Sequence, residues 1–472
     1  MVAHCVRTHA SGQAMIPITT FHGRRVAVFG LGSSGNATAA ALVAGGAHVV
    51  AWDDSPASRL AAEKAGLPIG DLASADWSQV SALVLAPGVP LTHPRPHWTV
   101  ERAHAAGVEV IGDIELFCRE RRKVCPEAKF IAITGTNGKS TTTAVIAHLL
   151  RQAGHDVQLG GNIGRAILTL EPLTAERIYV VECSSFQIDL APTIDPTVGV
   201  LLNVTPDHLD RHGTIENYAG VKERLIAGAT RAVIVVDDDW TRAAATRRRE
   251  AGQEIVTVST LQDAAVTAID STICEMGAPV VTLSGISSLR GRHNAENAAA
   301  AFAAVRAAGL RVSDIAPHFA TYPGLAHRLE QVAAFDGVLF INDSKATNAE
   351  STEKALKSFS GPIYLILGGR AKDGGIQSLR PLFSRITHAY LIGEASEAFA
   401  STLAGIVPFE RCGTMDVAVE CASAAAFAAG CPDSVVLLSP ACASFDQYRN
   451  FEERGEHFKA LVKNLIARRE AQ

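Results

Sequence analysis

The sequence lacks the features of several common protein classes. Among its 472 residues no apolar stretch reaches the ~18 residues that span a bilayer, so we expect no contact with a membrane. There is no strong excess of charge, because 43 Lys and Arg stand against 48 Asp and Glu and the net charge is −5. Without a basic field the chain is not expected to bind nucleic acid. The short basic runs 119–123 and 247–249 are interpreted as solvated helix faces.

Closely spaced cysteine pairs are also missing. The nine cysteines are scattered from Cys5 to Cys442 with no C-x-x-C pair. An odd number without framework spacing favours reduced thiols in a cytoplasmic protein over disulfides or a zinc cluster. The N-terminal stretch has no apolar core of signal-peptide length, and residues 1–20 are predicted to form a disordered extension.

Aromatic residues make up only 6% of the chain, and Ala and Gly supply much of its apolar content. Apolar strand-like runs alternate with helix-like segments in three series, which begin near residues 25, 130 and 338. This alternation predicts an α/β fold with mainly parallel sheets and right-handed crossovers. Three domains are expected after the extension: a Rossmann-like domain at 21–112, a central P-loop ATPase-like domain at 113–324, and a C-terminal Rossmann-like domain at 325–472.

One stretch of the central domain departs from this alternation. Between residues 253 and 290 three short apolar runs follow one another without helices between them, at 255–258, 265–266 and 280–283. They predict a small antiparallel addition to the central sheet.

A glycine-rich loop follows the first predicted strand. Gly30 to Gly35 reads G-x-G-x-x-G between a strand and a helix, and Asp53 ends the next strand. The pattern favours a dinucleotide site, in which backbone N–H groups face phosphate and the acid binds a ribose. Another phosphorylated ligand such as a UDP group, or a merely tight turn, satisfies the same pattern. The stiff loop 87–90, which includes Gly88, is a candidate wall for the ligand.

A second glycine-rich loop, G-T-N-G-K-S-T, is more specific. It lies between an apolar strand and a long helical segment, where N–H groups cradle phosphates. Lys139 would neutralise the terminal phosphates and the Ser140 hydroxyl would bind Mg²⁺. Its glycines enclose two residues, whereas the general phosphate-loop motif has four. The sequence therefore predicts an ATP site formed by Gly135, Thr136, Asn137, Gly138, Lys139, Ser140 and Thr141.

Two polar residues follow neighbouring strands of the ATP-binding domain. Glu182 comes at the end of the strand 178–181, and His208 follows the strand near 198–202. Because parallel sheets gather their ligands at the carboxyl ends of the strands, we expect both side chains to lie near the phosphates and to bind magnesium.

Several further segments carry a family resemblance. With the T-G-T-N-G-K-S-T loop, three of them resemble motifs of the Mur ligase superfamily, the ATP-dependent amide-forming enzymes of peptidoglycan assembly. These segments are Gly291–Asn297, Gly324–Glu330 and Asn342–Asn348. Other segments are similar to the D-glutamate-adding members, namely Gly112–Phe117, Gly160–Gly164, Glu182–Gln187 and Ser439–Gln447. The D-N-P-R motif of the diaminopimelate-adding members is absent.

The resemblance implies an ATP-dependent ligation of D-glutamate to UDP-N-acetylmuramoyl-L-alanine. The L-alanyl carboxylate attacks the γ-phosphate to give an acyl phosphate and ADP, and the amine of D-glutamate then displaces phosphate. Lys139 and two Mg²⁺ ions would neutralise the charge, one ion held by Ser140 and Glu182 and the other by His208. A carbamylated Lys222 would help to hold the second ion, although the residues alone describe Lys222 as an exposed helix lysine.

The resemblance also implies where the substrates bind. The N-terminal domain would hold UDP instead of a redox cofactor, with Gly32, Ser33, Ser34 and Gly35 at the diphosphate and Asp53 and Asp54 near the uracil. Asn162 would orient the L-alanyl arm. The D-glutamate residues implied are Thr347, Lys372, Ser444 and the Phe445 backbone, with Phe451 lining the substrate side. The further ATP contacts implied are Arg328 and Lys345 at the phosphates, Asp343 at the ribose and Asn297 at the adenine.

Three alternatives stay open at this point. An NAD-dependent oxidoreductase rests on the first glycine loop and Asp53 alone. Another amide ligase of the superfamily would share the ATP loop but accept a different amino acid. A non-catalytic nucleotide-binding module would release no phosphate. The favoured interpretation is a monomeric ligase that acts in the cytoplasm on small molecules.

Overall fold

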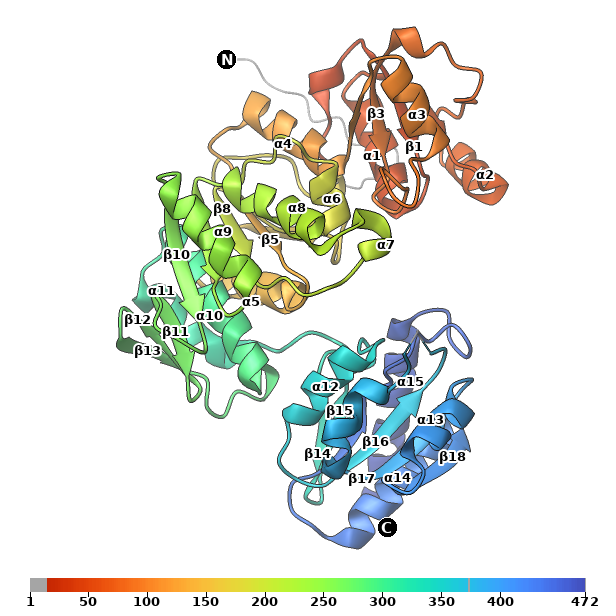
Figure 1. The fold of residues 1–472 in the computed structure, drawn as a ribbon, viewed down its shortest axis with the longest axis vertical. Helices are drawn as coiled ribbons and strands as arrows, with labels where there is room; N and C mark the ends of the chain where they lie inside the picture. Colours follow the sequence, from red (N-terminus) through yellow and green to blue (C-terminus); the bar gives the residue numbers. More distant parts are fainter. Residues whose placement is uncertain (1–14, 372–373, 472) are drawn as a thin grey trace. The chain divides into compact units, whose positions relative to one another are not determined.

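The computed structural model describes residues 15–371 and 374–471. The chain forms two compact units. The first contains the chain up to Thr282 together with Ala295–Thr321, and the second contains Leu283–Asn294 and the chain from Tyr322 onward. In Figure 1 the first unit is coloured mainly from red to green and the second mainly from cyan to blue. Among the described residues no helix combines the length and the apolar character needed to cross a bilayer.

The first unit begins with a four-stranded parallel sheet in the order β2-β1-β3-β4. Its central strand is buried from Val26 to Phe29, as the apolar run predicts for a strand with both faces covered. The strands are β1 (Arg25–Phe29), β2 (His48–Trp52), β3 (Val80–Leu85) and β4 (Glu109–Ile111). The helices are η1 (Thr19–Phe21), α1 (Ser33–Ala44), α2 (Pro56–Lys64), η2 (Trp77–Gln79) and α3 (Trp98–Ala105).

The first described residues, 15–20, pack against the rest of the first unit. Ile16 and Ile18 are buried, and their N–H groups donate to the carbonyls of Leu168 and Ala41, each at 3.0 Å. The prediction that residues 1–20 are disordered is therefore wrong for residues 15–20. The physical reason is that two isolated isoleucines bury apolar surface without forming an apolar run. Residues 1–14 lie outside the described residues.

The central sheet has nine strands in the order β13-β12-β11-β10-β9-β8-β5-β7-β6. Its strand β5 pairs in parallel with β7 on one side and β8 on the other. The strands are β5 (Lys129–Thr134), β6 (Val157–Gly161), β7 (Ile178–Glu182), β8 (Val198–Leu201), β9 (Arg231–Val235), β10 (Glu254–Ser259), β11 (Val266–Ile269), β12 (Thr272–Glu275) and β13 (Ala278–Thr282).

Helices connect and cover these strands, as Figure 1 shows for α5, α8 and α9. They are α4 (Asp113–Val124), α5 (Lys139–Gln152), η3 (Ile167–Thr169), α6 (Ser185–Asp189), α7 (Leu209–His212), α8 (Ile215–Ala227), α9 (Asp239–Glu250), α10 (Arg292–Ala307), α11 (Val312–Ile315) and η5 (Ala316–Thr321). The short helix η4 (Ser287–Leu289), between β13 and α10, belongs to the second unit.

The predicted antiparallel addition is confirmed for β11, β12 and β13, which pair antiparallel in sequence. It is wrong for β10, which pairs in parallel with both β9 and β11. The helix α9 lies between β9 and β10, and such a crossover returns the chain in the same direction. Only the later strands are joined by turns short enough for antiparallel hairpins.

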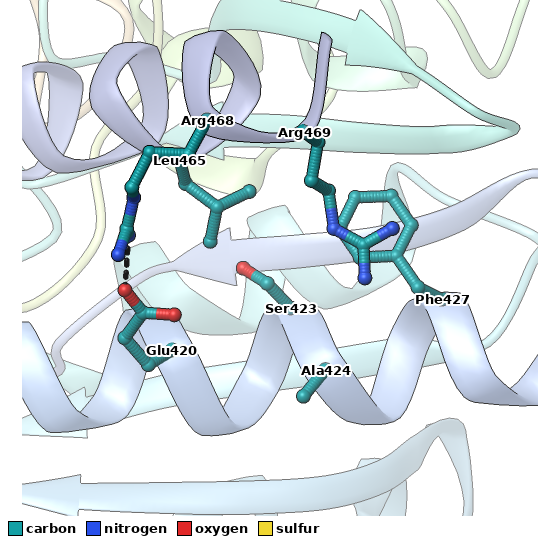
Figure 2. Close-up of a pocket in the computed structure, with 7 residues that line it drawn as sticks. All are labelled: Glu420, Ser423, Ala424, Phe427, Leu465, Arg468 and Arg469. Carbon is teal, nitrogen blue, oxygen red and sulfur yellow. Dashed lines mark hydrogen bonds and ion pairs between the residues drawn. The ribbon is translucent and has the colours of Figure 1, made fainter. Parts of the chain in front are cut away.

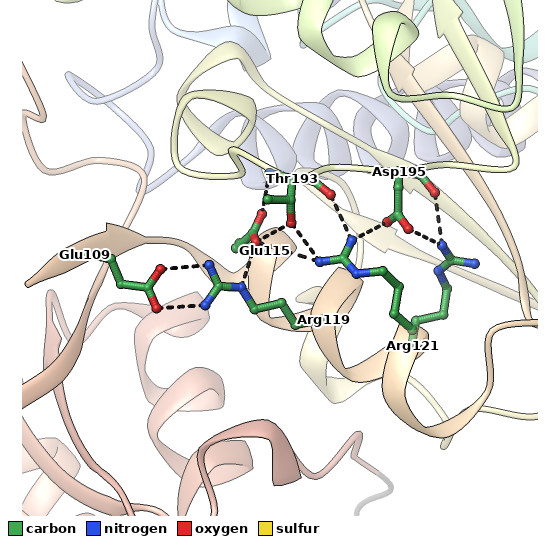
Figure 3. Close-up of polar contacts among 7 residues, drawn as sticks. Glu109, Glu115, Arg119, Arg121, Thr193 and Asp195 are labelled. Atoms are coloured by element: carbon green, nitrogen blue, oxygen red, sulfur yellow. Dashed lines mark hydrogen bonds and ion pairs between the residues drawn. The ribbon is translucent and has the colours of Figure 1, made fainter.

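A network of ion pairs on α4 connects the first sheet to the central domain (Figure 3). The carboxylate of Glu115 is fully buried and accepts hydrogen bonds from Arg119 Nε at 2.7 Å and from Thr193 N at 2.9 Å. The two terminal nitrogens of Arg119 also donate to the two carboxylate oxygens of Glu109 in β4, at 2.7 and 2.8 Å. Since Thr193 follows α6, this network joins the two sheets of the first unit.

The second unit is built on a six-stranded sheet in the order β14-β15-β19-β16-β17-β18. All of its pairings are parallel except that of β14 with β15. The strands are β14 (Glu330–Phe335), β15 (Val338–Asn342), β16 (Ile363–Gly368), β17 (Ile386–Ile392), β18 (Phe409–Gly413) and β19 (Ser434–Leu438). The helices are α12 (Ala349–Lys357), η6 (Gln377–Arg385), α13 (Ser396–Leu403), α14 (Met415–Ala429) and α15 (Phe451–Glu470).

Two hydrophobic cores lie on the two faces of this sheet. One contains apolar side chains of α12, η6 and α13, and the other contains those of α14 and α15. Helices on both faces of a mainly parallel sheet confirm the predicted α/β class for this unit. The domain boundaries placed near residues 112 and 324 stay predictions.

Candidate active site

The second glycine-rich loop, Gly135–Gly138, connects β5 of the nine-stranded sheet to α5. It is called the phosphate loop below, after its predicted ligand. Gly138 caps α5 with φ at 84°, in the left-handed region that favours glycine. A side chain at this position would not fit, because its Cβ would lie 2.1 Å from Asn297 Oδ1. The same Oδ1 accepts a hydrogen bond from Thr142 Oγ1 at 3.3 Å. The loop leads directly into the N-terminus of α5, a helix of 14 residues. The N-terminus of a helix stabilises a bound anion.

Asn203, which was not predicted from the sequence, holds this loop in shape through three hydrogen bonds. Its carbonyl accepts from Thr136 N at 2.8 Å, and its side chain accepts from Asn137 N at 2.8 Å. Its Nδ2 group donates back to the Asn137 carbonyl at 3.2 Å. The available signal was an amide side chain just after β8, the strand that pairs with β5.

Two lysines converge on one carbonyl of the loop. Lys139 Nζ donates to Gly135 O at 2.9 Å and to Thr136 O at 2.8 Å, and Lys222 Nζ donates to Gly135 O at 2.8 Å. Lys222 is only 1% exposed, so the description of it as an exposed helix lysine is wrong. The face of α8 that carries it packs toward the sheet, where its Nζ lies 4.5 Å from the ring centre of Tyr218. Burial, with the charge of Lys139 nearby, holds the pKa of Lys222 well below its usual value.

Glu182 ends β7, the strand next to the phosphate loop. It is 2% exposed, and its Oε1 accepts from Asn162 Nδ2 at 2.8 Å. The Asn162 N–H also donates to the Glu182 carbonyl at 2.9 Å, so these two predicted residues are brought together. The second carboxylate oxygen, Oε2, is buried without a hydrogen-bond partner among the described residues. Such an oxygen is costly unless a cation or a donor completes its environment.

His208 follows β8, on the other side of the phosphate loop. It caps the short helix α7 in a left-handed conformation, with φ at 52°. Its Nε2 lies 3.3 Å from Asp207 Oδ2, and its ring centre lies 4.9 Å from that of Phe186. Burial lowers its pKa, which favours the neutral imidazole that can bind a metal.

These residues fit a hard divalent cation bound beside phosphates. Glu182 ends β7, while Ser140 lies in the first turn of α5 after β5 and His208 lies in the loop after β8, and these three strands are neighbours in the sheet. Hydroxyl and carboxylate oxygens are the ligands that Mg²⁺ prefers. The unpartnered Oε2 of Glu182 is the feature of this structure that most clearly calls for such an ion.

The first glycine loop has the tight geometry that its pattern predicts. A Cβ on Gly30 would lie 2.6 Å from that of Ala86, and one on Gly35 would lie 1.7 Å from the Gly30 carbonyl oxygen. The hydroxyl of Ser34, one residue into α1, donates to Asp113 Oδ2 at 2.7 Å. The glycines therefore serve close packing of strand and helix, as in sheets that bind phosphorylated ligands at this edge.

Both oxygens of Asp53 bind backbone N–H groups of this region. Oδ2 accepts from Leu31 N at 2.6 Å, and Oδ1 accepts from Ser55 N at 2.8 Å. The next acid, Asp54, accepts from His97 Nε2 at 3.1 Å. In this structure the first acid supports the loop itself, so its contact with a ribose or a uracil stays a prediction.

The candidate wall at Gly88 is tied to the central domain. Arg211 donates from Nη1 to the Gly88 carbonyl at 3.0 Å and from Nη2 to the Val89 carbonyl at 2.9 Å. The guanidinium also lies 4.6 Å from the ring centre of Phe186. Arg211, on α7, was another residue that the sequence analysis did not single out.

The second unit holds the remaining predicted ATP contacts. Asp343 follows β15 and accepts from Leu329 N at 3.2 Å and from Ser439 Oγ at 2.8 Å. Its burial raises the pKa of this carboxyl to about 7. Lys345 Nζ lies 3.7 Å from the ring centre of Phe451, the first residue of α15.

The residues predicted for D-glutamate differ in exposure. Ser444 is 3% exposed and Phe445 is 64% exposed, while the Thr347 N–H donates to Lys345 O at 2.8 Å. Lys372 lies outside the described residues. Arg328 and Leu325 form an isolated antiparallel β-bridge. The binding roles of all these residues stay predictions.

A hollow of about 180 Å³ lies elsewhere in the second unit, between α14 and α15 (Figure 2). Arg468 pairs with Glu420 across it, and the guanidinium of Arg469 lies 3.8 Å from the ring centre of Phe427. Ser423, Ala424 and Leu465 complete the lining. None of the predicted site residues lines this hollow.

Known proteins match both the central and the C-terminal parts of the chain. The Mur ligase middle domain family matches residues 133–305, and the family described as "Mur ligase, glutamate ligase domain" matches residues 327–442. A solved UDP-N-acetylmuramate-alanine ligase from Thermotoga maritima has a TM-score of 0.58 at 16% identity, covering 93% of this chain and 99% of that chain. The fold and the matched domains thus define a Mur ligase.

Sequence relatives narrow the class further. A UDP-N-acetylmuramoylalanine--D-glutamate ligase from Chelativorans sp. (strain BNC1) is 58% identical over 457 residues, covering 96% of this chain and 98% of the relative. The enzyme of the same name from Brucella abortus (strain 2308) is 57% identical over 461 residues, with the same coverage. The chain belongs to the UDP-N-acetylmuramoylalanine--D-glutamate ligase family. An oxidoreductase is therefore no longer a competing interpretation of the first glycine loop.

Proposed function

We propose that this protein joins D-glutamate to UDP-N-acetylmuramoyl-L-alanine and converts ATP to ADP and phosphate, a step of peptidoglycan precursor synthesis. The observation that carries the proposal is that Lys139 and the buried Lys222 donate to the same carbonyl of Gly135, while the neighbouring strand β7 ends at Glu182, one of whose oxygens has no hydrogen-bond partner among the described residues. The chain is also 58% identical over 457 residues to a relative named UDP-N-acetylmuramoylalanine--D-glutamate ligase.

Charge neutralisation dominates the first step, because the L-alanyl carboxylate must approach the γ-phosphate of ATP. Lys139 lies folded over the loop and would turn toward the phosphates when they bind. The N-terminus of α5 adds a fixed positive dipole end at the same place. Asn162, whose side chain donates to Glu182, would orient the arm that carries the carboxylate. The acyl phosphate is then attacked by the amine of D-glutamate, and phosphate leaves.

Magnesium, when bound, would offset the phosphate charge further. Ser140 and Glu182 would hold one ion, and His208 with a carbamylated Lys222 would hold a second. A carbamate forms when an uncharged amine adds to CO₂ and loses a proton. The buried Lys222 favours that uncharged form, since desolvation disfavours the ammonium. The product is an oxygen ligand of the kind that a hard metal prefers.

The substrate contacts are part of the same proposal. The loop Gly32–Gly35 would bind the diphosphate of the UDP group, and Asp53 and Asp54 would lie near the uracil. In the second unit Thr347, Lys372, Ser444 and Phe445 would bind D-glutamate, and Phe451 would line the substrate side. Asn297, Arg328, Asp343 and Lys345 would contact ATP. We further propose that the protein acts as a monomer in the cytoplasm.

Phosphate release with defined substrates tests the proposal. The enzyme is supplied with UDP-N-acetylmuramoyl-L-alanine, ATP and Mg²⁺, together with D-glutamate, L-glutamate, L-lysine or diaminopimelate in separate reactions. We expect phosphate and an amide product with D-glutamate only. Release with one of the other amino acids but not with D-glutamate would identify a different amide ligase, and no release in any mixture would indicate a nucleotide-binding module.

A further inference from the structure

Two cysteines and a glutamate of the second unit lie together although the chain separates them. Cys412 and Glu410 belong to β18, and Cys421 belongs to α14. One ligand atom from each residue, a thiol sulfur or a carboxylate oxygen, lies within 4.8 Å of both others. This proximity shows that the side chains of Glu410 and Cys412 both lie toward Cys421 of α14, although the pairing register of β18 shifts at Cys412.

The spacing of these atoms matches a tetrahedral metal site. Zinc binds thiolate sulfur at ~2.3 Å and carboxylate oxygen at ~2.1 Å, so two such ligands at the tetrahedral angle lie about 3.6 Å apart. The observed distance from Cys421 Sγ to Glu410 Oε1 is 3.6 Å. Two thiolates on the same ion would lie about 3.8 Å apart, and no two of the three ligand atoms here are more than 4.8 Å apart.

The surroundings suit a bound ion that is reached from solvent. Cys412 is buried at 8% exposure, against the apolar side chains of Met415 and Val419 in the core beneath α14. Cys421 is half-buried and Glu410 is exposed, so the three ligands run from the core to the surface. An ion could enter beside Glu410 and keep water as a fourth ligand, as open zinc sites do.

We propose that Glu410, Cys412 and Cys421 form a binding site for a thiophilic divalent cation such as Zn²⁺. The site lies in the second unit and contains none of the residues assigned to ATP, magnesium or the substrates. The two thiols release their protons to water when the ion binds, and the carboxylate supplies the third bond. The cation is distinct in kind from Mg²⁺, which prefers oxygen ligands.

Cobalt is the probe that tests this site, because thiolate-to-cobalt charge transfer reports sulfur ligation directly. The full-length protein is reduced, freed of metal with a chelator and titrated with Co²⁺, and Zn²⁺ is then added to displace the cobalt. We expect a charge-transfer band that saturates at one Co²⁺ per chain and is bleached by Zn²⁺. Absence of the band in the wild-type protein overturns the proposal.

Four variants locate the ligands. Cys412→Ser and Cys421→Ser should each lose the two-thiolate band, and Glu410→Gln should keep it with affinity weakened at least about tenfold. Cys431→Ser is the matched control, since Cys431 is an exposed thiol of the same unit and should leave the titration unchanged. A full band in Cys421→Ser, or a band lost in Cys431→Ser, contradicts the assignment. Because Cys421 is half-buried and Glu410 exposed, these two variants remain decisive if Cys412→Ser fails to fold.

Discussion

Gly138 lies so close to Asn297 that replacing it by alanine should lower the free energy of unfolding. Replacing Gly138 by Ala places a side chain on backbone with φ at 84°, which costs roughly 1–2 kcal/mol for a non-glycine residue. The new Cβ would also lie 2.1 Å from Asn297 Oδ1, so the amide must move. Its movement breaks the hydrogen bond from Thr142 and leaves buried polar atoms unpaired, for about 1–3 kcal/mol more. We expect Gly138→Ala to destabilise the first unit by ~2–5 kcal/mol in total.

A double-mutant cycle separates the two contributions. In an Asn297→Ala background the amide is gone, so Gly138→Ala should cost only the ~1–2 kcal/mol of backbone strain. The assay is urea unfolding followed by tryptophan fluorescence. All four tryptophans, at 52, 77, 98 and 240, belong to the first unit, so the signal reports the unit that contains the phosphate loop.

The coupling energy between the two substitutions shows whether the Asn297 amide crowds a side chain at position 138. A coupling energy of about 2 kcal/mol is expected, with Gly138→Ala less harmful when Asn297 is absent. Equal costs in the two backgrounds, within about 0.5 kcal/mol, would show that the amide does not crowd the loop and would refute the reasoning. ATP-dependent phosphate release should fall in Gly138→Ala in parallel, because the loop must shift to admit the methyl group.

Three further predictions concern single side chains. Glu115→Ala should lower the unfolding free energy of the first unit by ~3 kcal/mol, because the N–H and the hydroxyl of Thr193 lose their acceptor, while Arg119 keeps Glu109 as a partner; a loss below about 1 kcal/mol in the fluorescence assay would contradict this. Burial raises the pKa of Asp343 from 3.8 to about 7, so the folded chain holds that proton more tightly than the unfolded chain. The stability of the second unit should therefore fall by up to ~4 kcal/mol as pH rises from about 4 to about 7 and then level off, and Asp343→Asn should flatten that fall in a calorimetric pH series. Lys222→Ala should abolish phosphate release at saturating Mg²⁺ while the exposed-lysine control Lys64→Ala retains it; undiminished activity of Lys222→Ala would remove this lysine from the mechanism.

The phosphate loop shows which features of the structure could be predicted from the sequence and which could not. A strand, a short glycine turn and a helix are local features, and their hydrogen bonds form between near neighbours in the chain. The strand–loop–helix arrangement of this loop and the α/β class were therefore predictable, and the positions of Glu182 and His208 after neighbouring parallel strands could be predicted because such strands end at a common edge. The partner of the loop, Asn203, was not predicted, since nothing local distinguishes it from other amides after strands.

The errors have the same physical origin. Residues 15–20 were expected to be disordered because no apolar run marks them, yet Ile16 and Ile18 pack against partners far along the chain. The strand β10 was assigned to an antiparallel addition because the crossover by α9 was not connected with it. In both cases the outcome depends on which distant faces meet, and local pattern does not encode that.

By itself the sequence determined the phosphate loop, the alternation of strands and helices, and the family resemblance that its motifs carry. These features depend on backbone propensity and on spacing along the chain. Only the tertiary structure decided that Lys222 is buried beside the loop, that one oxygen of Glu182 lacks a hydrogen-bond partner among the described residues, and that ligand atoms of Cys412 and Cys421 lie within 4.8 Å of each other. The reason is that burial and ligand geometry arise from the packing of a helix face on a sheet, which joins residues that the chain keeps apart.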